Sequence, residues 1–203
     1  PNGETLTSPG VEYIEWPDSY PIDCNAFMSD NTGKNVKYLW DPNQYINVMI
    51  YNFTSDPETN SITLGISHLP FTTTGNNSLE GLNETKYSYL ELKNLNFPYC
   101  CSINSLYIDQ QSTSTTYNTT DVTVTVAHEL GHYLGVHHVF SEDENGTYDG
   151  CTDSDYCKDT PTYNKVYYDQ WIDIQLSLGV RDLPTLALRE NCTTGQKFTS
   201  RNI

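Results

Sequence analysis

Basic residues are scarce in this sequence, and long hydrophobic runs are missing from it. Lys and Arg total 10 against 26 Asp and Glu, which gives a formal net charge of -16. A negative field of this size repels nucleic-acid phosphates and anionic membrane surfaces, so we expect neither as a partner. No stretch approaches the roughly 18 consecutive apolar residues of a membrane helix, so no membrane span is predicted.

Zinc-ribbon and redox Cys-x-x-Cys spacings are also missing. Disulfides are therefore the expected use of the six cysteines, although their connectivity stays open: Cys24, Cys100, Cys101, Cys151, Cys157 and Cys192. Neighbouring cysteines do not easily bond each other, so Cys100 and Cys101 are expected to reach different places. Disulfides favour a secreted or extracellular/periplasmic location. The sequence begins at Pro1 without a basic and apolar leader segment, and whether a signal peptide has been removed stays open.

What is present is a globular composition, with 36% hydrophobic residues in 203. This length is enough for one domain or for two small lobes that share a cleft. Residues 1–35 are rich in Pro, Gly, Asn and Asp and predict an irregular lead-in. Strands are predicted at 45–53 (YINVMIYNF) and 61–69 (SITLGISHL), and a short third strand at 106–108 (LYI).

The segment that follows gives two conflicting signals. The run VTVTV at 122–126 alternates like a strand. Apolar residues also recur at every fourth position, as on one face of a helix: Val122, Val126, Leu130 and Leu134. Asp121 or Thr120 can cap a helix, and Gly135 can end it, so a helix over about 121–134 is predicted. Its last three apolar residues are expected to pack against a sheet.

Two histidines on this helix stand four residues apart, so that they project from the same face. His128 and His132 can therefore bind one metal ion. A catalytic zinc ion usually takes three protein ligands and one water molecule. A sharp turn at Gly135 can bring His138 back as the third ligand. Glu129 is then placed beside the metal as a general base, which is the chemistry of a metallopeptidase.

One alternative weighs against this interpretation. The short His-Glu-x-x-His motif also occurs by chance, and the site would then be a structural histidine cluster. The glycine and the third histidine at the required offsets favour zinc. His137 is left unassigned, and the isolated His68 is interpreted as a surface or strand residue.

The string HELGHYLGVHH resembles the metzincin signature His-Glu-x-x-His-x-x-Gly-x-x-His, and within that clan the chain is similar to the pappalysin (cytophagalysin-type) peptidases. YINVMIYNF and ITLGISHLPF are similar to the family's strands before the active-site helix, and GCTDSDYCKDTP resembles its downstream segment. The similarity covers roughly residues 45 to 161 and part of the C-terminal tail. It implies a secreted zinc endopeptidase that acts on proteins or peptides.

The resemblance also implies a structural calcium ion. Asp155, Thr160 and the carbonyl of Lys158 would help to bind it, and Cys151 would anchor the same loop, with Cys192 as a candidate partner. Residues 141–159 hold many carboxylates, which suit calcium, but a solvated acidic loop is the alternative.

The expected fold is α/β (α+β) and metzincin-like, a mixed twisted sheet with the active-site helix above a cleft. We expect an N-terminal subdomain at 1–138 and a loop-rich C-terminal subdomain at 139–203. Metzincins place a methionine turn beneath the zinc, but Met28 and Met49 both precede the helix. The final GQKFTSRNI is similar to the run before that turn, so the chain is expected to end ahead of it. The alternative function is a non-catalytic, metal-bound peptide-binding module, and the oligomeric state is open.

Overall fold

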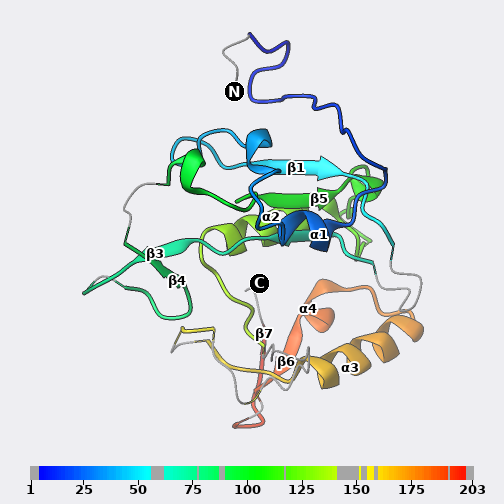
Figure 1. Cartoon of the computed structure of the whole chain (residues 1–203). Helices are drawn as coiled ribbons and strands as arrows, with labels where there is room; N and C mark the ends of the chain where they lie inside the picture. Colours follow the sequence, from blue (N-terminus) through cyan, green and yellow to red (C-terminus); the bar gives the residue numbers. More distant parts are fainter. Residues whose placement is uncertain are drawn as a thin grey trace.

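The computed structural model describes residues 5–55, 62–76, 78–86, 90–116, 118–140, 151, 155–157, 160–191 and 193–199. Figure 1 shows the arrangement of the elements. The helices are α1 (Cys24–Met28), α2 (Val122–Tyr133), α3 (Lys165–Ser177) and α4 (Leu183–Leu186), with 3-10 turns η1 (Val36–Tyr38), η2 (Leu92–Asn94) and η3 (Ser105–Tyr107). The strands are β1 (Val48–Tyr51), β2 (Gly65–Ser67), β3 (Phe71–Thr73), β4 (Asn83–Thr85), β5 (Cys101–Asn104), β6 (Leu188–Glu190) and β7 (Lys197–Thr199).

The main sheet has the strand order β1-β5-β2. β1 is parallel to β5, whereas β2 is antiparallel to it, with Ile66 opposite Ser102. The sheet is therefore mixed, and β2 forms one edge of it. Two further pairs complete the described strands: β3 with β4 in parallel, and β6 with β7 antiparallel.

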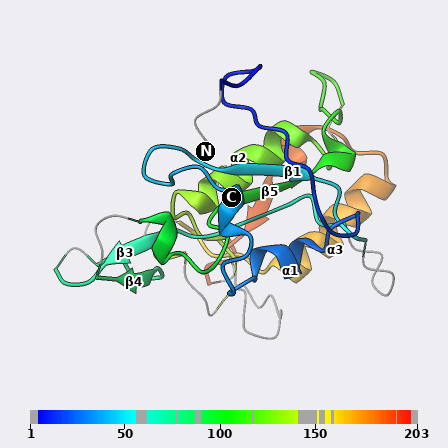
Figure 2. The ribbon, with the colours of Figure 1, turned by 45° about the horizontal axis from the view of Figure 1, so that its top comes forward.

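The two faces of β5 meet different helices (Figure 2). The Ser102 hydroxyl donates to the sulfur of Met28 in α1 at 3.2 Å. The neighbouring Cys101 points the other way, and its thiol donates to the carbonyl of Glu129 in α2 at 3.4 Å. Because successive side chains of a strand alternate between faces, the sheet lies between α1 and α2. This confirms the predicted mixed α/β fold.

The hydrophobic core lies around this sheet and α1. Leu39 and Ile103 are each 1% exposed, and Cys100 is 0% exposed. Tyr133 of α2 stacks on Tyr99, with ring centroids 4.7 Å apart, which attaches the helix to the core. Full burial of an apolar side chain contributes about 1.5–3 kcal/mol to the stability of the fold. Moving α2 away from the core would lose such contributions, so packing holds the helix in place.

Several local predictions need correction. The irregular lead-in contains α1, which Asp23 caps by accepting from the N–H of Ala26 at 3.0 Å. The third strand is not at 106–108 but at Cys101–Asn104. The Asn104 side chain accepts from the N–H of Leu106 at 3.2 Å, which ends the strand and begins η3.

The predicted disulfides are not found for four of the six cysteines. Cys24, Cys100, Cys101 and Cys157 are free thiols. Cys100 and Cys101 point to opposite faces of the sheet, where the thiol of Cys100 donates to the sulfur of Met28 at 3.7 Å. Burial raises the pKa of the Cys101 thiol to about 11, so it packs as a neutral side chain. Cys192 lies outside the described residues.

The part of the chain after the histidines contains more helix than the loop-rich prediction suggests. α3 has 13 residues, and the Asn164 side chain caps it by accepting from the N–H of Tyr167 at 3.1 Å. None of the described α3 side chains is fully buried. Among the described helices, none has the length and apolar character that a bilayer crossing demands.

Candidate metal centre

The start of α2 is fixed by Asp121. Its carboxylate accepts from the N–H groups of Thr123 at 2.8 Å and Val124 at 3.3 Å, and from that of Ser112 at 2.6 Å. These bonds, the one from Ser112 first, hold the pKa of Asp121 at about 2. The bonds from Thr123 and Val124 satisfy backbone donors that would otherwise lack a partner at the start of a helix. The cap therefore decides in favour of the predicted helix over the alternating strand pattern.

The end of α2 is a sharp turn at Gly135, whose φ is +99°. The N–H of Val136 donates to the carbonyl of Gly131 at 2.9 Å, and the N–H of Gly135 donates to that of His132 at 2.8 Å. This pair of bonds is the Schellman motif, which needs a residue of positive φ and therefore favours glycine. The turn reverses the chain and directs residues 136–138 back along the helix.

The three predicted ligands converge. The Nε2 atom of His132 lies 3.0 Å from that of His128 and 3.0 Å from that of His138, and the remaining pair is 3.1 Å apart. Three nitrogens about 2.0–2.1 Å from one tetrahedral zinc ion would be about 3.3 Å apart. The observed triangle is within a few tenths of an ångström of that spacing, so the three half-buried imidazoles could hold one ion.

The hydrogen bonding of His132 fits a metal ligand. Its Nδ1 lies 2.7 Å from the carbonyl oxygen of Val136. A carbonyl only accepts, so Nδ1 is the donor, and in the neutral ring Nε2 is left with a lone pair directed at the other two histidines. Metal-binding histidines usually donate their second ring N–H in this way. The turn at Gly135 thus both returns His138 and orients His132.

Aromatic packing holds the third ligand. Phe140 stacks on His138, with ring centroids 4.4 Å apart and an interplanar angle of 16°. Val139 between them is 3% exposed. The returning segment is therefore anchored directly after the ligand, in addition to the turn before it.

Glu129 lies on the helix face that meets the sheet. Its side chain is 5% exposed, and this burial raises its pKa to about 7. It is not one of the three residues whose ligand atoms lie within 4.8 Å of one another. A methyl group on Gly65 of β2 would overlap the Glu129 side chain, so the carboxylate packs directly against this strand.

The predicted sheet-facing stripe of α2 is partly wrong. Leu130 packs against the core, but Leu134 is 70% exposed. The buried stripe is instead Val122, Thr125, Glu129 and Tyr133. The Thr125 hydroxyl donates to the carbonyl of Asp121 at 3.0 Å, which allows this polar side chain to be buried.

The two remaining histidines stand apart from the cluster. The ring of His137 packs against Tyr156, with centroids 5.0 Å apart. His68 is neither a surface nor a strand residue: it comes directly after β2, is half-buried, and its Nε2 lies 3.1 Å from the carbonyl of Met28. Burial lowers the pKa of His68, so it packs as a neutral ring.

The calcium prediction finds no support. Lys158 lies outside the described residues. The carboxylate of Asp155 accepts from the nearby N–H of Cys157 at 2.9 Å, and the N–H of Thr160 donates to the Cys157 carbonyl at 3.2 Å. These are local turn bonds, and they bring no set of oxygen ligands together among the described residues.

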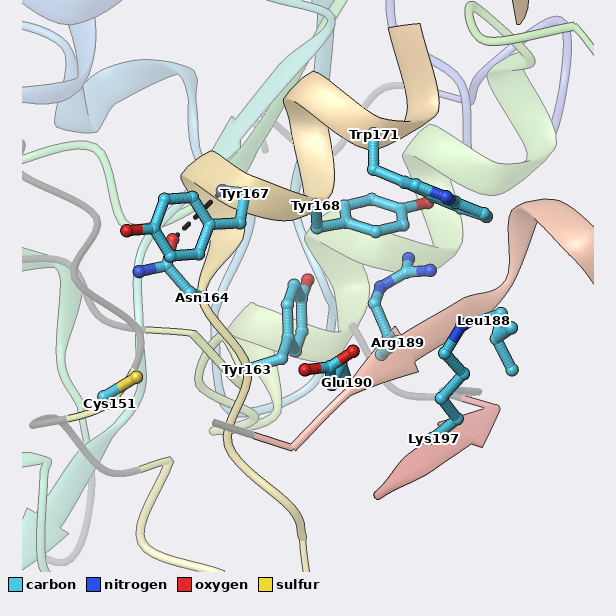
Figure 3. Close-up of a pocket in the computed structure, with 10 residues that line it drawn as sticks. All are labelled: Cys151, Tyr163, Asn164, Tyr167, Tyr168, Trp171, Leu188, Arg189, Glu190 and Lys197. Carbon is cyan, nitrogen blue, oxygen red and sulfur yellow. Dashed lines mark hydrogen bonds between the residues drawn. The ribbon is translucent and has the colours of Figure 1, made fainter. Parts of the chain in front are cut away.

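A pocket of about 380 Å³ opens beyond Phe140 (Figure 3). Tyr163 forms one wall, and its ring lies 5.9 Å from that of Phe140. Arg189 of β6 lies over two rings that line the pocket, 3.3 Å from the centroid of Tyr168 and 5.2 Å from that of Tyr163. The pocket is thus connected to His138 through two aromatic contacts.

The fold and this site together define a class: a mixed α/β domain with three histidines on a His-Glu-x-x-His helix and its return turn, as in metzincin metallopeptidases. A family model described as pregnancy-associated plasma protein-A matches residues 30–178. The match spans most of the chain, so the chain belongs to this peptidase family, the pappalysins. Members are zinc metallopeptidases that act on proteins. Neither the curated proteins nor the solved structures contain a significant match.

Proposed function

We propose that this chain is a zinc-dependent endopeptidase in which His128, His132 and His138 hold the metal and Glu129 is the general base. The observation that carries the proposal is the triangle of Nε2 atoms, with sides of 3.0, 3.0 and 3.1 Å. The family match supports the same activity.

The separate roles of the zinc ion and of Glu129 follow from their chemistry. A zinc ion at this site supplies a Lewis acid that lowers the pKa of water to about 7 and polarises a peptide carbonyl. Glu129 takes the proton of the attacking water and passes it to the leaving amine. Its buried carboxylate suits this work, because burial brings its pKa to about 7, close to neutral pH.

The free edge of β2 offers a place for an extended peptide. The carbonyl of Leu64 accepts from the N–H of Asn104 in β5, and the N–H of His68 donates to the carbonyl of Cys100 just before β5. In an antiparallel pair, alternate residues direct their backbone groups to opposite sides, so those of Gly65 and Ser67 face the outer edge. A substrate strand can pair with them by β-augmentation. The peptide then lies between this edge and the segment after His138, at the proposed boundary of the two subdomains 1–138 and 139–203.

The proposed location is outside the cell or in the periplasm. Pappalysins are generally extracellular, which supports this placement. The negative charge of -16 also suits a protein that works free of nucleic acid and anionic surfaces.

The decisive experiment replaces Glu129 with Gln, which keeps the shape of the side chain but removes the base. Cleavage of casein or gelatin is measured together with zinc content by mass spectrometry. We expect one zinc per chain in both proteins and a loss of kcat of about 100-fold to 10,000-fold in the variant. Glu91→Gln, at a partly exposed residue paired with Lys93, is the matched control and should cleave at the wild-type rate.

The opposite outcome identifies the alternative function. Equal zinc content with cleavage by neither protein, while both still bind peptides, would make this chain a metal-bound recognition module and would refute the peptidase proposal.

A further inference from the structure

Gly65 in the edge strand β2 lies unusually close to the Glu129 side chain. A Cβ atom built on Gly65 would lie 2.6 Å from Cγ, 2.7 Å from Oε1 and 2.9 Å from Cδ of Glu129. Real Cβ atoms essentially never approach other heavy atoms to less than 3.0 Å. Any residue other than glycine at this position therefore requires the Glu129 side chain or the strand to move.

The backbone conformation does not explain this glycine. Gly65 has no positive φ, unlike Gly135, and it sits in a regular strand register opposite Ile103. Glycine inside a strand weakens it relative to alanine, because glycine loses more conformational freedom on folding and has no side chain to pack. The reason for a glycine at position 65 is therefore steric: the Glu129 side chain occupies the space that a Cβ atom would fill.

The position of Gly65 also joins two parts of the proposed site. Its Cα faces Glu129, while its backbone N–H and C=O face the outer edge of the sheet, where we place the substrate. The distance between Gly65 and Glu129 thus sets how far the carboxylate stands from a peptide paired with this edge.

We propose that Gly65 is a positioning residue, which admits the Glu129 carboxylate between α2 and β2 and so sets the carboxylate's place beside the metal. The inference rests on the proposed peptidase function. An added methyl group displaces Glu129 because the atoms it meets belong to a flexible side chain, whereas β2 is held by its pairing with β5.

The test is the variant Gly65→Ala in the zinc-loaded protein. A misplacement of about 1 Å can lower a rate about 100-fold, so we expect a fall in kcat of that order. KM should change by less than about 3-fold, because the strand keeps its backbone groups at the edge. Zinc content and melting temperature should stay at wild-type values. A kcat equal to that of the wild type would overturn the proposal.

A double-variant cycle with Glu129→Asp separates positioning from a general effect on the strand. Aspartate is shorter by one methylene group and leaves room for the added methyl. If Gly65 acts through Glu129, Gly65→Ala should lower kcat by less than about 3-fold in the Glu129→Asp background, although it lowers the wild-type value about 100-fold. Equal losses in both backgrounds would show that the methyl group acts on the strand, against the proposal.

Crystal structures of zinc-loaded wild type and Gly65→Ala distinguish a failure of this inference from a failure of the peptidase proposal. If the wild type holds zinc but cleaves nothing, the activity is wrong, and the structures still decide the role of Gly65. We expect a displaced Glu129 carboxylate beside an unmoved β2. A shifted strand with the carboxylate in place would refute the inference.

Discussion

The regions before and after the histidines are packed by different means. The upper region, the described residues up to 140, holds the sheet and α2; the lower region, 160–191 and 193–199, holds α3 and the β6-β7 pair (Figure 1). The helices α2 and α3 are nearly equal in length, with 12 and 13 residues, and both are capped by a side chain. Only α2 buries side chains fully. Among the described residues of the lower region only Tyr163 and Leu186 are buried, and Arg189 lies over two aromatic rings there.

This difference shows where the rigidity of the proposed site comes from. His128, His132 and Glu129 belong to a helix that is fixed by the core on one side and by caps at both ends, and His138 follows the turn at its C-terminal end. The lower region touches the metal centre through Phe140 and Tyr163. Changes in the upper region should therefore alter metal binding and global stability, whereas changes in the lower region should act locally.

The largest effect is expected at the metal ligands. His132→Ala removes one of three nitrogens and the bond to Val136 that orients it. We expect the isolated variant to retain less than about a tenth of the wild-type zinc and to show no measurable cleavage. His137→Ala is the matched control, because His137 lies one position from a ligand but outside the cluster. Equal zinc loss in both variants would contradict the three-histidine site.

The next largest effect is on stability. Ile103 is 1% exposed in the sheet, while Ile174 is 56% exposed on α3. Ile103→Ala should lower the free energy of unfolding by about 2–5 kcal/mol, because it leaves a cavity in the core. Ile174→Ala should change it by less than about 0.5 kcal/mol. Urea denaturation measures both, and similar losses would mean that the two regions are packed alike.

A smaller, local effect is expected from Arg189→Lys. The guanidinium carbon of Arg189 lies 3.3 Å from the centroid of the Tyr168 ring, and the compact ammonium group of lysine does not reproduce the contact of a planar guanidinium. The lost interaction is worth about 0.5–2 kcal/mol. Hydrogen exchange should become faster in α3 and β6 but stay unchanged in α2. Faster exchange in α2 as well would show that the lower region supports the metal centre.

The smallest effect concerns pH. Burial lowers the pKa of His68, so below about pH 6.5 the unfolded chain binds a proton more readily than the folded one. Its contribution to stability is present above that pH and is lost as the pH falls through the folded pKa. Metal-free His68→Gln should therefore lose less stability than the wild type between pH 7.5 and 5.5. Identical losses of stability in the two proteins would show that His68 does not cause the pH dependence.

The sequence predicted the local parts of the site and missed the non-local ones. The helix caps, the turn at Gly135 and the three histidines are encoded within a short stretch, so spacing was enough to predict them. Gly65 lies far from Glu129 in the sequence, and only the packing of β2 against α2 brings them together. A glycine inside the run SITLGISHL was the one available signal for a close approach.

Fold prediction failed where a side chain ended an element early or where no apolar pattern existed. Asn104 stops β5 by capping η3, so the apolar run after it is not a strand. α3 was not predicted, and none of its described side chains is buried in a stripe that packs against the core. The capping residue Asn164 was the main signal for this helix in the sequence.

X-ray absorption spectroscopy of the zinc-loaded chain at neutral pH tests the metal centre most directly. We expect a first shell of three imidazole nitrogens at about 2.0–2.1 Å with one oxygen, and loss of one imidazole in His138→Ala. A shell rich in carboxylate oxygens, or one that His138→Ala leaves unchanged, would contradict the proposed site.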